Sequence, residues 1–415
     1  MASWKKVRLG EIVQINPESL TKQFPFQMID YIDISSVGTG ELRETSQYLI
    51  HEAPSRAKRL VRAGDTILST VRPNRRSFLF LKNPKENQVV STGFAVLRPT
   101  EHIHPRYVYY LISNQSFTDY LVSQEQGAAY PAVSMDSIKN ALVLLPDMRT
   151  QEKIADILGT IDDKIELNIK INKTIDETIM TLYKYWFIEF GPFKDRGFEI
   201  SELGMIPKGW KAGTLGEVIE LQNGYAFKSK EWKCEGIPVI KIKNIVPPFI
   251  NKEDAAYVDP SLFHRLDRFK ITQGDLLIGL TGAEIGKCGI YYFEEPALLN
   301  QRVGKFYSSV HEMNTLPFVY AITKLPDFRQ KILDRSTGSA QPNVSADEIK
   351  KMKIVLPPDD ILKKFIRFTS NYYAMMIQNA NENDRLKKLQ NALLPRLLSG
   401  EMDVLDAEKH VANML

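Results

Sequence analysis

The sequence contains the same plan twice. The segment that begins at Trp4 returns at Trp210, an offset of 206 residues, and the segment that ends at Pro146 returns at Pro357, an offset of 211 residues. The repeated stretches keep their order along the chain. Because each repeat has the length of a domain, the sequence predicts two similar domains. Such a molecule presents two similar surfaces, which suits the reading of two separated stretches of one ligand.

Each copy reads as a mixed α/β globule, over residues 1–150 and 208–358. Residues 64–69 resemble a turn that feeds a strand, and residues 94–99 a strand that ends at proline. Residues 107–122 have apolar residues at nearly helical spacing, and the second copy has a similar helical stretch from residue 316 to 333. The expected fold class is therefore α/β (α+β), with two similar domains related by an internal pseudo-two-fold repeat.

After each globule the sequence takes the period of a coiled coil, over residues 151–190 and 359–400. Four asparagines occupy equivalent seam positions in the two segments: Asn168, Asn172, Asn379 and Asn383. Because a buried asparagine fixes helix register, we expect the two helices to pack as an antiparallel coiled coil, with these amides meeting across the seam. The alternative is that the asparagines are solvated.

Helix-breaking residues delimit the remaining segments. Gly191-Pro192 ends the first helix, and residues 191–207 form a linker to the second domain. Pro395 is expected to kink or end the second helix, so that Leu397-Leu398 would belong to a separate turn before a tail at 401–415.

Composition excludes several classes of protein. A formal net charge of +4 does not by itself indicate nucleic-acid binding. The two cysteines, Cys234 and Cys288, lack metal-type spacing, so neither a disulfide framework nor a zinc site is expected. The start of the chain lacks the apolar core of a signal peptide, and no apolar run approaches the roughly 20 residues that span a bilayer. We expect a soluble, cytoplasmic protein.

Short motifs with a fixed order point to a family. They are Gly-Asp-Thr-Ile-Leu-Ser-Thr-Val-Arg-Pro at 64–73, Leu-Pro with Gln-Glu-Lys-Ile-Ala at 145–155, Tyr-Trp-Phe-Ile-Glu-Phe-Gly-Pro at 185–192, Ile-Pro-Lys-Gly-Trp at 206–210, Asn-Gln-Arg-Val at 300–303 and Leu-Leu-Pro-Arg-Leu-Leu-Ser-Gly at 393–400. With them, essentially the whole chain resembles the specificity (S) subunit of a type I restriction-modification system. One departure is that Gln151, which opens the first helix, corresponds to Leu362 in the second copy, which puts any shared role of Gln151 in doubt.

The resemblance implies a DNA-reading scaffold. In that family each target-recognition domain reads one half of a bipartite site in double-stranded DNA. The helices space the domains and dock two methyltransferase (M) subunits, and restriction (R) subunits join that core. The resemblance therefore implies a subunit without catalytic residues, cofactor or metal of its own.

Basic and amide side chains supply candidates for DNA contact, because cations bind phosphates and forked polar groups read base edges. In the first domain Arg62 accompanies the candidates Arg56, Lys58, Arg59, Arg72, Asn74, Arg75 and Arg76. In the second domain the candidates are Lys241, Lys243, Asn244, Lys287 and Arg302. The neighbouring Gln301 could contact adenine or be structural, and any single cation could equally belong to a solvated loop.

Glycine-rich loops occupy the same place in each copy, at residues 127–131 and 338–343. Tyr130 and Gln341 stand at their tips, and both are DNA-contact candidates. A simple turn ahead of the strands at Val133 and Val344 explains the same residues equally well.

Other functions fit the sequence less well. Val246-Pro247-Pro248-Phe249 lacks the amide or carboxylate that an adenine methyltransferase needs. Asp275, Glu284 and Lys287 come nearest to a metal-dependent nuclease site, but the spacing from Glu284 to Lys287 is three residues rather than two. The remaining alternative is an adaptor that binds only protein through its coiled-coil helices.

Overall fold

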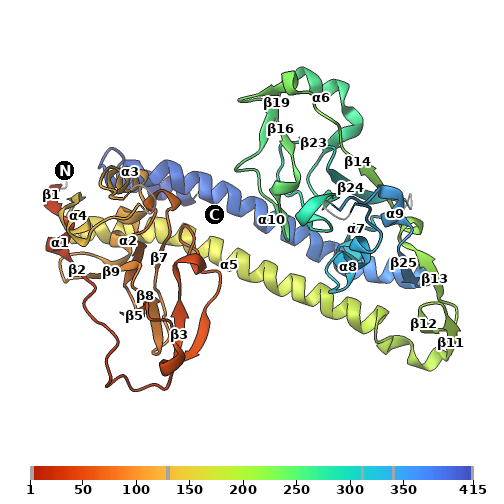
Figure 1. The fold of residues 1–415 in the computed structure, drawn as a ribbon. Helices are drawn as coiled ribbons and strands as arrows, with labels where there is room; N and C mark the ends of the chain where they lie inside the picture. Colours follow the sequence, from red (N-terminus) through yellow and green to blue (C-terminus); the bar gives the residue numbers. More distant parts are fainter. Residues whose placement is uncertain (1–3, 128–130, 310–312, 339–341, 413–415) are drawn as a thin grey trace. The chain divides into compact units, whose positions relative to one another are not determined.

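The computed structural model of the protein contains two helices of 40 residues each, α5 (Met148–Phe187) and α10 (Asp359–Leu398). The structure describes residues 4–127, 131–309, 313–338 and 342–412. By its contacts the chain divides into two compact units, residues 1–164 with 385–415 and residues 165–384. Each long helix contributes residues to both units (Figure 1).

The first unit contains two four-stranded sheets. One is antiparallel, in the order β2 (Val13–Ile15), β9 (Phe94–Pro99), β6 (Thr66–Ser69), β7 (Phe78–Phe80). The other is mixed, in the order β4 (Ser46–Leu49), β3 (Met28–Ile32), β8 (Gln88–Ser91), β5 (Ala57–Leu60). Ile67, Phe94 and Val96 are fully buried between them, so the two sheets share one apolar core.

Helices cover the antiparallel sheet of the first unit. The helix α2 (Pro105–Ser113) lies against β6, β7 and β9, and α3 (Gln115–Ser123) follows it. A two-stranded ribbon of β1 (Lys5–Arg8) and β10 (Leu142–Leu145) leads into α5. The α2 residues Tyr107, Val108, Tyr110 and Leu111 are buried, as the helical spacing of this stretch predicts.

The second unit repeats and enlarges this plan. Its larger sheet has the order β14 (Ile219–Asn223), β24 (Val303–Ser308), β21 (Leu276–Gly279), β22 (Cys288–Ile290), β18 (Phe249–Ile250), β17 (Ile245–Val246). A second sheet contains β15 (Trp232–Lys233), β19 (Ala256–Val258), β16 (Ile237–Ile240), β23 (Ala297–Leu299) and β20 (Lys270–Ile271). The ribbon of β13 (Lys211–Thr214) and β25 (Lys353–Leu356) corresponds to that of β1 and β10. The prediction of two similar mixed domains is confirmed.

The long helices pack antiparallel through their asparagines in the second unit. Asn168 donates from Nδ2 to Oδ1 of Asn383 at 2.9 Å and to Glu382 at 2.7 Å. Asn379 donates to Oδ1 of Asn172 at 2.9 Å, and Asn172 donates to the carbonyl of Met376 at 3.1 Å. The bonded residue numbers rise along α5 as they fall along α10, which is the antiparallel sense. Asn168 is only 1% exposed and Asn172 7%, so the amides are seam positions rather than solvated ones.

The end of α10 differs from expectation, and the linker contains regular structure. Pro395 lies inside α10, which continues to Leu398, so the prediction that Leu397-Leu398 form a separate turn is wrong. A proline removes only one backbone donor, and its own carbonyl still accepts from Ser399 N at 3.0 Å. The expected linker contains a short 3-10 helix at Gly191–Arg196 and a hairpin of β11 (Phe198–Ser201) and β12 (Gly204–Pro207).

Candidate nucleic-acid interface

Each domain has a loop of similar geometry shortly after a central strand. We name residues 72–76, with the 3-10 turn η3 (Pro73–Arg75), the first recognition loop. We name residues 282–286, with the turn η9 (Gly282–Glu284), the second recognition loop. The first follows β6 and the second follows β21, and these strands occupy the same position beside β9 and β24.

Backbone hydrogen bonds match between the two loops. Arg75 N donates to Arg72 O at 2.9 Å, and Ile285 N donates to Gly282 O at 3.1 Å. At the base of the loops Ser69 N donates to Ser77 O at 2.8 Å, and Gly279 N donates to Lys287 O at 2.9 Å. A constant offset of 210 residues relates these bonds in the two loops, which share no residue type. The loops differ at their last residue, because Arg76 N donates to Pro73 O whereas its counterpart Gly286 N donates to Gly279 O.

The backbone of the first recognition loop is strained. Arg72 and Arg76 have φ of 50° and 53°, in the left-handed region, where their counterparts Gly282 and Gly286 have φ of 70° and 79°. A residue with a side chain costs roughly 1–2 kcal/mol more than glycine in this conformation. The first domain thus holds arginine at two positions where glycine would be free of strain.

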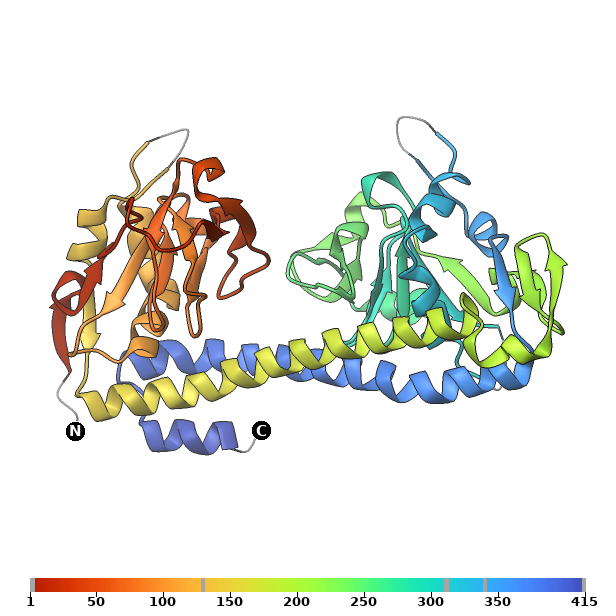
Figure 2. The same cartoon turned by 90° about the horizontal axis from the view of Figure 1, so that it is seen from below.

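A second segment lies beside each recognition loop. Arg72 N donates to Pro131 O and Gly282 N donates to Pro342 O, both at 2.8 Å. Gln126 pairs with Ala132, and Thr337 with Asn343, as isolated bridges on either side of the glycine-rich loops. In Figure 2 these flanking residues stand, within each unit, at the end of the domain opposite the long helices. The tip residues Tyr130 and Gln341 lie outside the described residues, so their DNA contacts stay predictions.

The candidates on the first recognition loop differ in availability. Asn74 and Arg75 are exposed, and Arg72 is half-buried. Arg76 is engaged inside the domain: Nη1 donates to Oε1 of Gln115 and Nη2 donates to Ser113 O, both at 2.6 Å. The free side chains of this loop are therefore an amide and a guanidinium, the groups that read base edges and bind phosphate.

The candidates around β5 form a second group. Arg56 and Lys58 are exposed, whereas Arg59 is half-buried and burial lowers the pKa of its guanidinium. The carbonyl of Arg56 accepts from Thr92 N at 2.8 Å, and the adjacent Gly93 O accepts from Thr70 N at 2.9 Å. The turn at Thr92 and Gly93 thus connects, by hydrogen bonds, the end of β5 near Arg56 with the end of β6, which leads into the first recognition loop. Arg62, by contrast, forms an ion pair with Glu18.

The second domain brings fewer candidates to its recognition loop. Arg302 is exposed, and its carbonyl accepts from Leu280 N at 3.0 Å, two residues before that loop. Gln301 is also exposed beside it. Lys287 follows the loop directly, but its ammonium is paired with Glu284. The second recognition loop therefore has no unpaired cation among residues 282–287 of its own.

Three further candidates lie near β16. Lys243 is exposed, while the Lys241 ammonium lies 3.9 Å from the centre of the Trp232 ring. Burial, and then the charge of Lys243, lower the pKa of Lys241. Asn244 is buried; its Oδ1 accepts from Lys241 N and its Nδ2 donates to Asn251 O, both at 2.9 Å. Both polar atoms of the Asn244 side chain thus form hydrogen bonds within the domain, and Asn244 could contact a base only if these bonds were broken.

Sequence reasoning overlooked Arg329 of the helix α8 (Phe328–Leu333). Its Nη2 donates to Ala283 O at 2.8 Å and its Nε donates to Ile285 O at 3.2 Å, so it holds the second recognition loop from outside. It also missed the structural role of Gln151, whose side chain accepts from His104 N at 2.9 Å and donates to Pro146 O at 3.0 Å. The counterpart of Gln151, Leu362, joins the apolar core.

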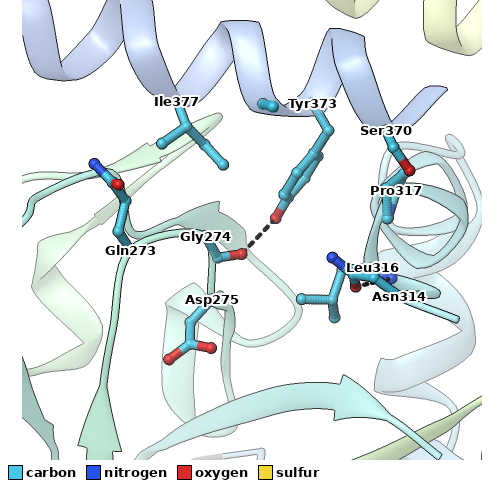
Figure 3. Close-up of a pocket in the computed structure, with 10 residues that line it drawn as sticks. Gln273, Gly274, Asp275, Asn314, Leu316, Pro317, Ser370, Tyr373 and Ile377 are labelled. Carbon is cyan, nitrogen blue, oxygen red and sulfur yellow. Dashed lines mark hydrogen bonds between the residues drawn. The ribbon is translucent and has the colours of Figure 1, made fainter. Parts of the chain in front are cut away.

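A cavity of about 280 Å³ lies in the second unit between the turn before β21 and α10 (Figure 3). Tyr373 donates from its hydroxyl to Gly274 O at 3.1 Å across it. The lining carboxylate, Asp275, accepts from Thr272 N at 2.8 Å and pairs with Lys305 at 3.3 Å, and burial raises its pKa. None of the DNA-contact candidates lines this cavity.

The described residues contain neither a metal-binding cluster nor a membrane-spanning helix. Within those ranges no group of three or more His, Cys, Asp or Glu is placed to hold a metal ion. No described helix has the length and apolar character to cross a membrane.

Comparison with known proteins gives consistent matches over most of the chain. The family described as "Type I restriction modification DNA specificity domain" matches residues 1–177 and 207–389. The type I restriction enzyme HindI specificity subunit of Haemophilus influenzae is 24% identical over 97% of this chain and 100% of its own length. The MjaIX specificity subunit of Methanocaldococcus jannaschii is 26% identical over 95% of this chain and 88% of its own.

A solved structure shows the same fold. The crystal structure of the type I restriction-modification system S subunit from M. genitalium matches with a TM-score of 0.57 at 15% identity, over 96% of each chain. At this identity the match bears on the arrangement of helices and strands alone.

Proposed function

The chain belongs to the family of type I restriction modification DNA specificity domains, and from this we propose that each of its two mixed domains reads one half of a bipartite site in double-stranded DNA. One observation carries the proposal: a loop with matching hydrogen bonds at its base and a left-handed residue at each end, with a glycine-rich segment beside it, follows the central strand of both domains. The two loops share these backbone features but not side chains. This is the pattern expected of two readers with different target sequences.

The first recognition loop offers the chemistry for direct contact. Asn74 can present its amide to adenine and Arg75 its guanidinium to guanine or phosphate, since both side chains are exposed. The strain at Arg72 supports a role there, because left-handed residues with side chains persist where function requires them. Arg56, Lys58 and Lys243 are proposed as phosphate contacts that position the domains.

The long helices are proposed to set the distance between the half-sites and to dock two methyltransferase subunits, which restriction subunits then join. Forty residues of α5 span about 60 Å at 1.5 Å per residue. On α10, Phe368, Tyr372 and Met375 lie at helical spacing on one face and are 58%, 39% and 44% exposed. A stripe of large apolar side chains at this spacing suits a partner helix.

The chain itself is proposed to be non-catalytic, with bond-making and bond-breaking left to the partner subunits. The alternative of a protein-only adaptor differs in its salt dependence. A domain pair with about six phosphate contacts should lose roughly a thousandfold in DNA affinity between 50 and 200 mM salt. Apolar docking of helices should not weaken over that range.

Selection of DNA from a random duplex pool tests the proposal. The chain is purified with type I methyltransferase subunits, and bound duplexes are recovered at moderate salt and sequenced. We expect two short constant blocks separated by an unread gap of fixed length. One uninterrupted block, or no enrichment at all, would contradict reading by two domains.

A further inference from the structure

We infer that Arg76 and Arg329 are positioning residues that hold the two recognition loops on the helices beside them. The inference rests on the proposed function and deepens it, because it separates the residues that orient each reading loop from those that contact DNA. The sequence analysis predicted that Arg76 binds DNA directly, and it made no prediction for Arg329. The contacts of both arginines indicate the same structural role, which is to fix a loop to a helix.

The first tether runs from the loop to the helices. The Arg76 guanidinium binds Ser113 O at the end of α2 and the Gln115 side chain at the start of α3, both at 2.6 Å. It also lies 5.9 Å from the centre of the Phe78 ring, which belongs to the strand after the loop. The backbone of Arg76 closes the loop by donating to Pro73 O at 2.9 Å. A single residue thus ends the loop and fastens it to the scaffold.

The second tether runs in the opposite direction. The counterpart of Arg76 is Gly286, which has no side chain to donate. The arginine is instead on the helix: Arg329 binds the loop carbonyls of Ala283 and Ile285 at 2.8 and 3.2 Å. A Cβ at Gly286 would meet Cγ of Arg329 at 3.2 Å, so the arginine packs directly on the place that Arg76 occupies in the first domain. In both domains an arginine therefore links the loop to a neighbouring helix. In the first domain the loop supplies the arginine, and in the second domain the helix supplies it.

The geometry argues against a phosphate role for Arg76. A guanidinium that contacts DNA must turn donors outward, whereas both terminal nitrogens of Arg76 already bind oxygen atoms of the same domain. Its Nε is buried. Arg75, one residue earlier, is exposed and is the natural comparison. Reading loops need rigid support, because a small displacement of a base-contacting group loses its hydrogen bonds.

The test uses the complex of the full chain with methyltransferase subunits and the duplex selected as above. The variants are Arg76→Ala, Arg76→Lys, Arg329→Ala and Arg329→Lys. Arg335→Ala is the matched control, because Arg335 follows the same helix and its guanidinium donates back to that helix, to Lys331 O at 3.0 Å. For each variant we measure the dissociation constant at several salt concentrations, the base preference of each half-site, and the melting temperature.

We expect Arg76→Ala to bind about tenfold more weakly or worse, with relaxed base preference in one half-site only, and Arg329→Ala to relax only the other half. The slope of log affinity against log salt should stay as in the unsubstituted chain, because no phosphate contact is lost. The lysine variants should resemble the alanine variants, since a single ammonium nitrogen lacks the planar fork whose separate nitrogens reach the two acceptors. Because lysine keeps the charge and most of the packing, it serves where an alanine variant does not fold.

Three results would overturn the inference. A salt slope reduced by about 0.9 in Arg76→Ala would show a phosphate contact. Full rescue by Arg76→Lys would show that charge alone matters. Unchanged base preference in both halves for Arg329→Ala, or a loss equal to that in Arg335→Ala, would remove the tether from the second domain. If the unsubstituted complex selects no split site, the proposed function fails instead, and the two failures are distinguishable.

Discussion

Replacing Asn172 by leucine tests whether the seam amides stabilise the helix pair as a coupled set. Asn172 is 7% exposed; it accepts from Asn379 at 2.9 Å and donates to Met376 O at 3.1 Å. Asn172→Leu leaves the amide of Asn379 without its partner in the seam. A polar group left unpaired by loss of its partner costs about 1–3 kcal/mol. Asn379 is half-buried, so the lower part of this range is expected.

The double variant gives the sharper result. Asn172→Leu with Asn379→Leu removes both members of the pair and places two apolar side chains across the seam. Such replacement is often neutral or stabilising. We therefore expect the double variant to lose less than the sum of the two single losses, by about 1 kcal/mol or more.

Urea unfolding, followed by the helix signal in circular dichroism, measures these free energies of unfolding. Equal slopes of free energy against urea concentration would confirm that each variant undergoes the same unfolding transition. Asn391→Leu is the control, because Asn391 is exposed on α10, the helix that carries Asn379. For this variant we expect a loss of unfolding free energy within about 0.5 kcal/mol. Additive single losses, or single losses as small as that of Asn391→Leu, would refute the reasoning that the amides act as a buried pair.

Three further predictions follow from the same structure. Arg75→Ala should weaken DNA binding and reduce the salt slope by about 0.9, with an unchanged melting temperature; lower stability would instead give Arg75 a structural role. Burial raises the pKa of Asp162, whose carboxylate accepts from Tyr110 and Gln390 at 2.6 Å. A carboxyl group whose pKa is raised by folding destabilises the folded state as the pH rises above about 4, the ordinary pKa of aspartate. Asp162→Asn should therefore have a higher melting temperature than the unsubstituted chain at pH 7 but not at pH 3. A gain in melting temperature that does not depend on pH would contradict this. Removing seven residues from each long helix should shorten the unread gap by about 3 base pairs, from about 10.5 Å of lost helix, and an unchanged gap in the selected DNA would show that the helices do not set the spacing.

Features that depend on local periodicity could be predicted from the sequence. The asparagines that contact one another across the helices are those that the four-and-three spacing placed on the seam, because that spacing depends only on neighbouring residues. The duplication likewise predicted two similar domains, but it did not match residues 72–76 with residues 282–286, because these loops share no residue type. It could not reveal that Arg72 and Arg76 adopt glycine-like backbone angles, since that conformation is imposed by the strands and loops around them.

The roles of the basic residues could not be predicted in the same way. A cation in a sequence has no visible partner, and Arg76 finds its partners 37 and 39 residues away, on helices that only the fold brings near. Lys241 lies on an aromatic ring, and Asn244 closes its own loop. Arg329 was missed because a single arginine in a short helix carries no pattern. Counting charges therefore drew attention to residues 72–76 but could not show that Arg76 binds within the domain while Arg75 is exposed.

Exchange of one domain tests the central claim most directly. Residues 1–150 are replaced by the corresponding residues of a related specificity subunit, the chimaera is expressed with methyltransferase subunits, and the methylated sites are mapped across a genome. We predict a split motif in which one half changes with the exchanged domain, while the base sequence of the other half is retained. A motif altered in both halves, or an unchanged motif, would contradict independent reading by two domains.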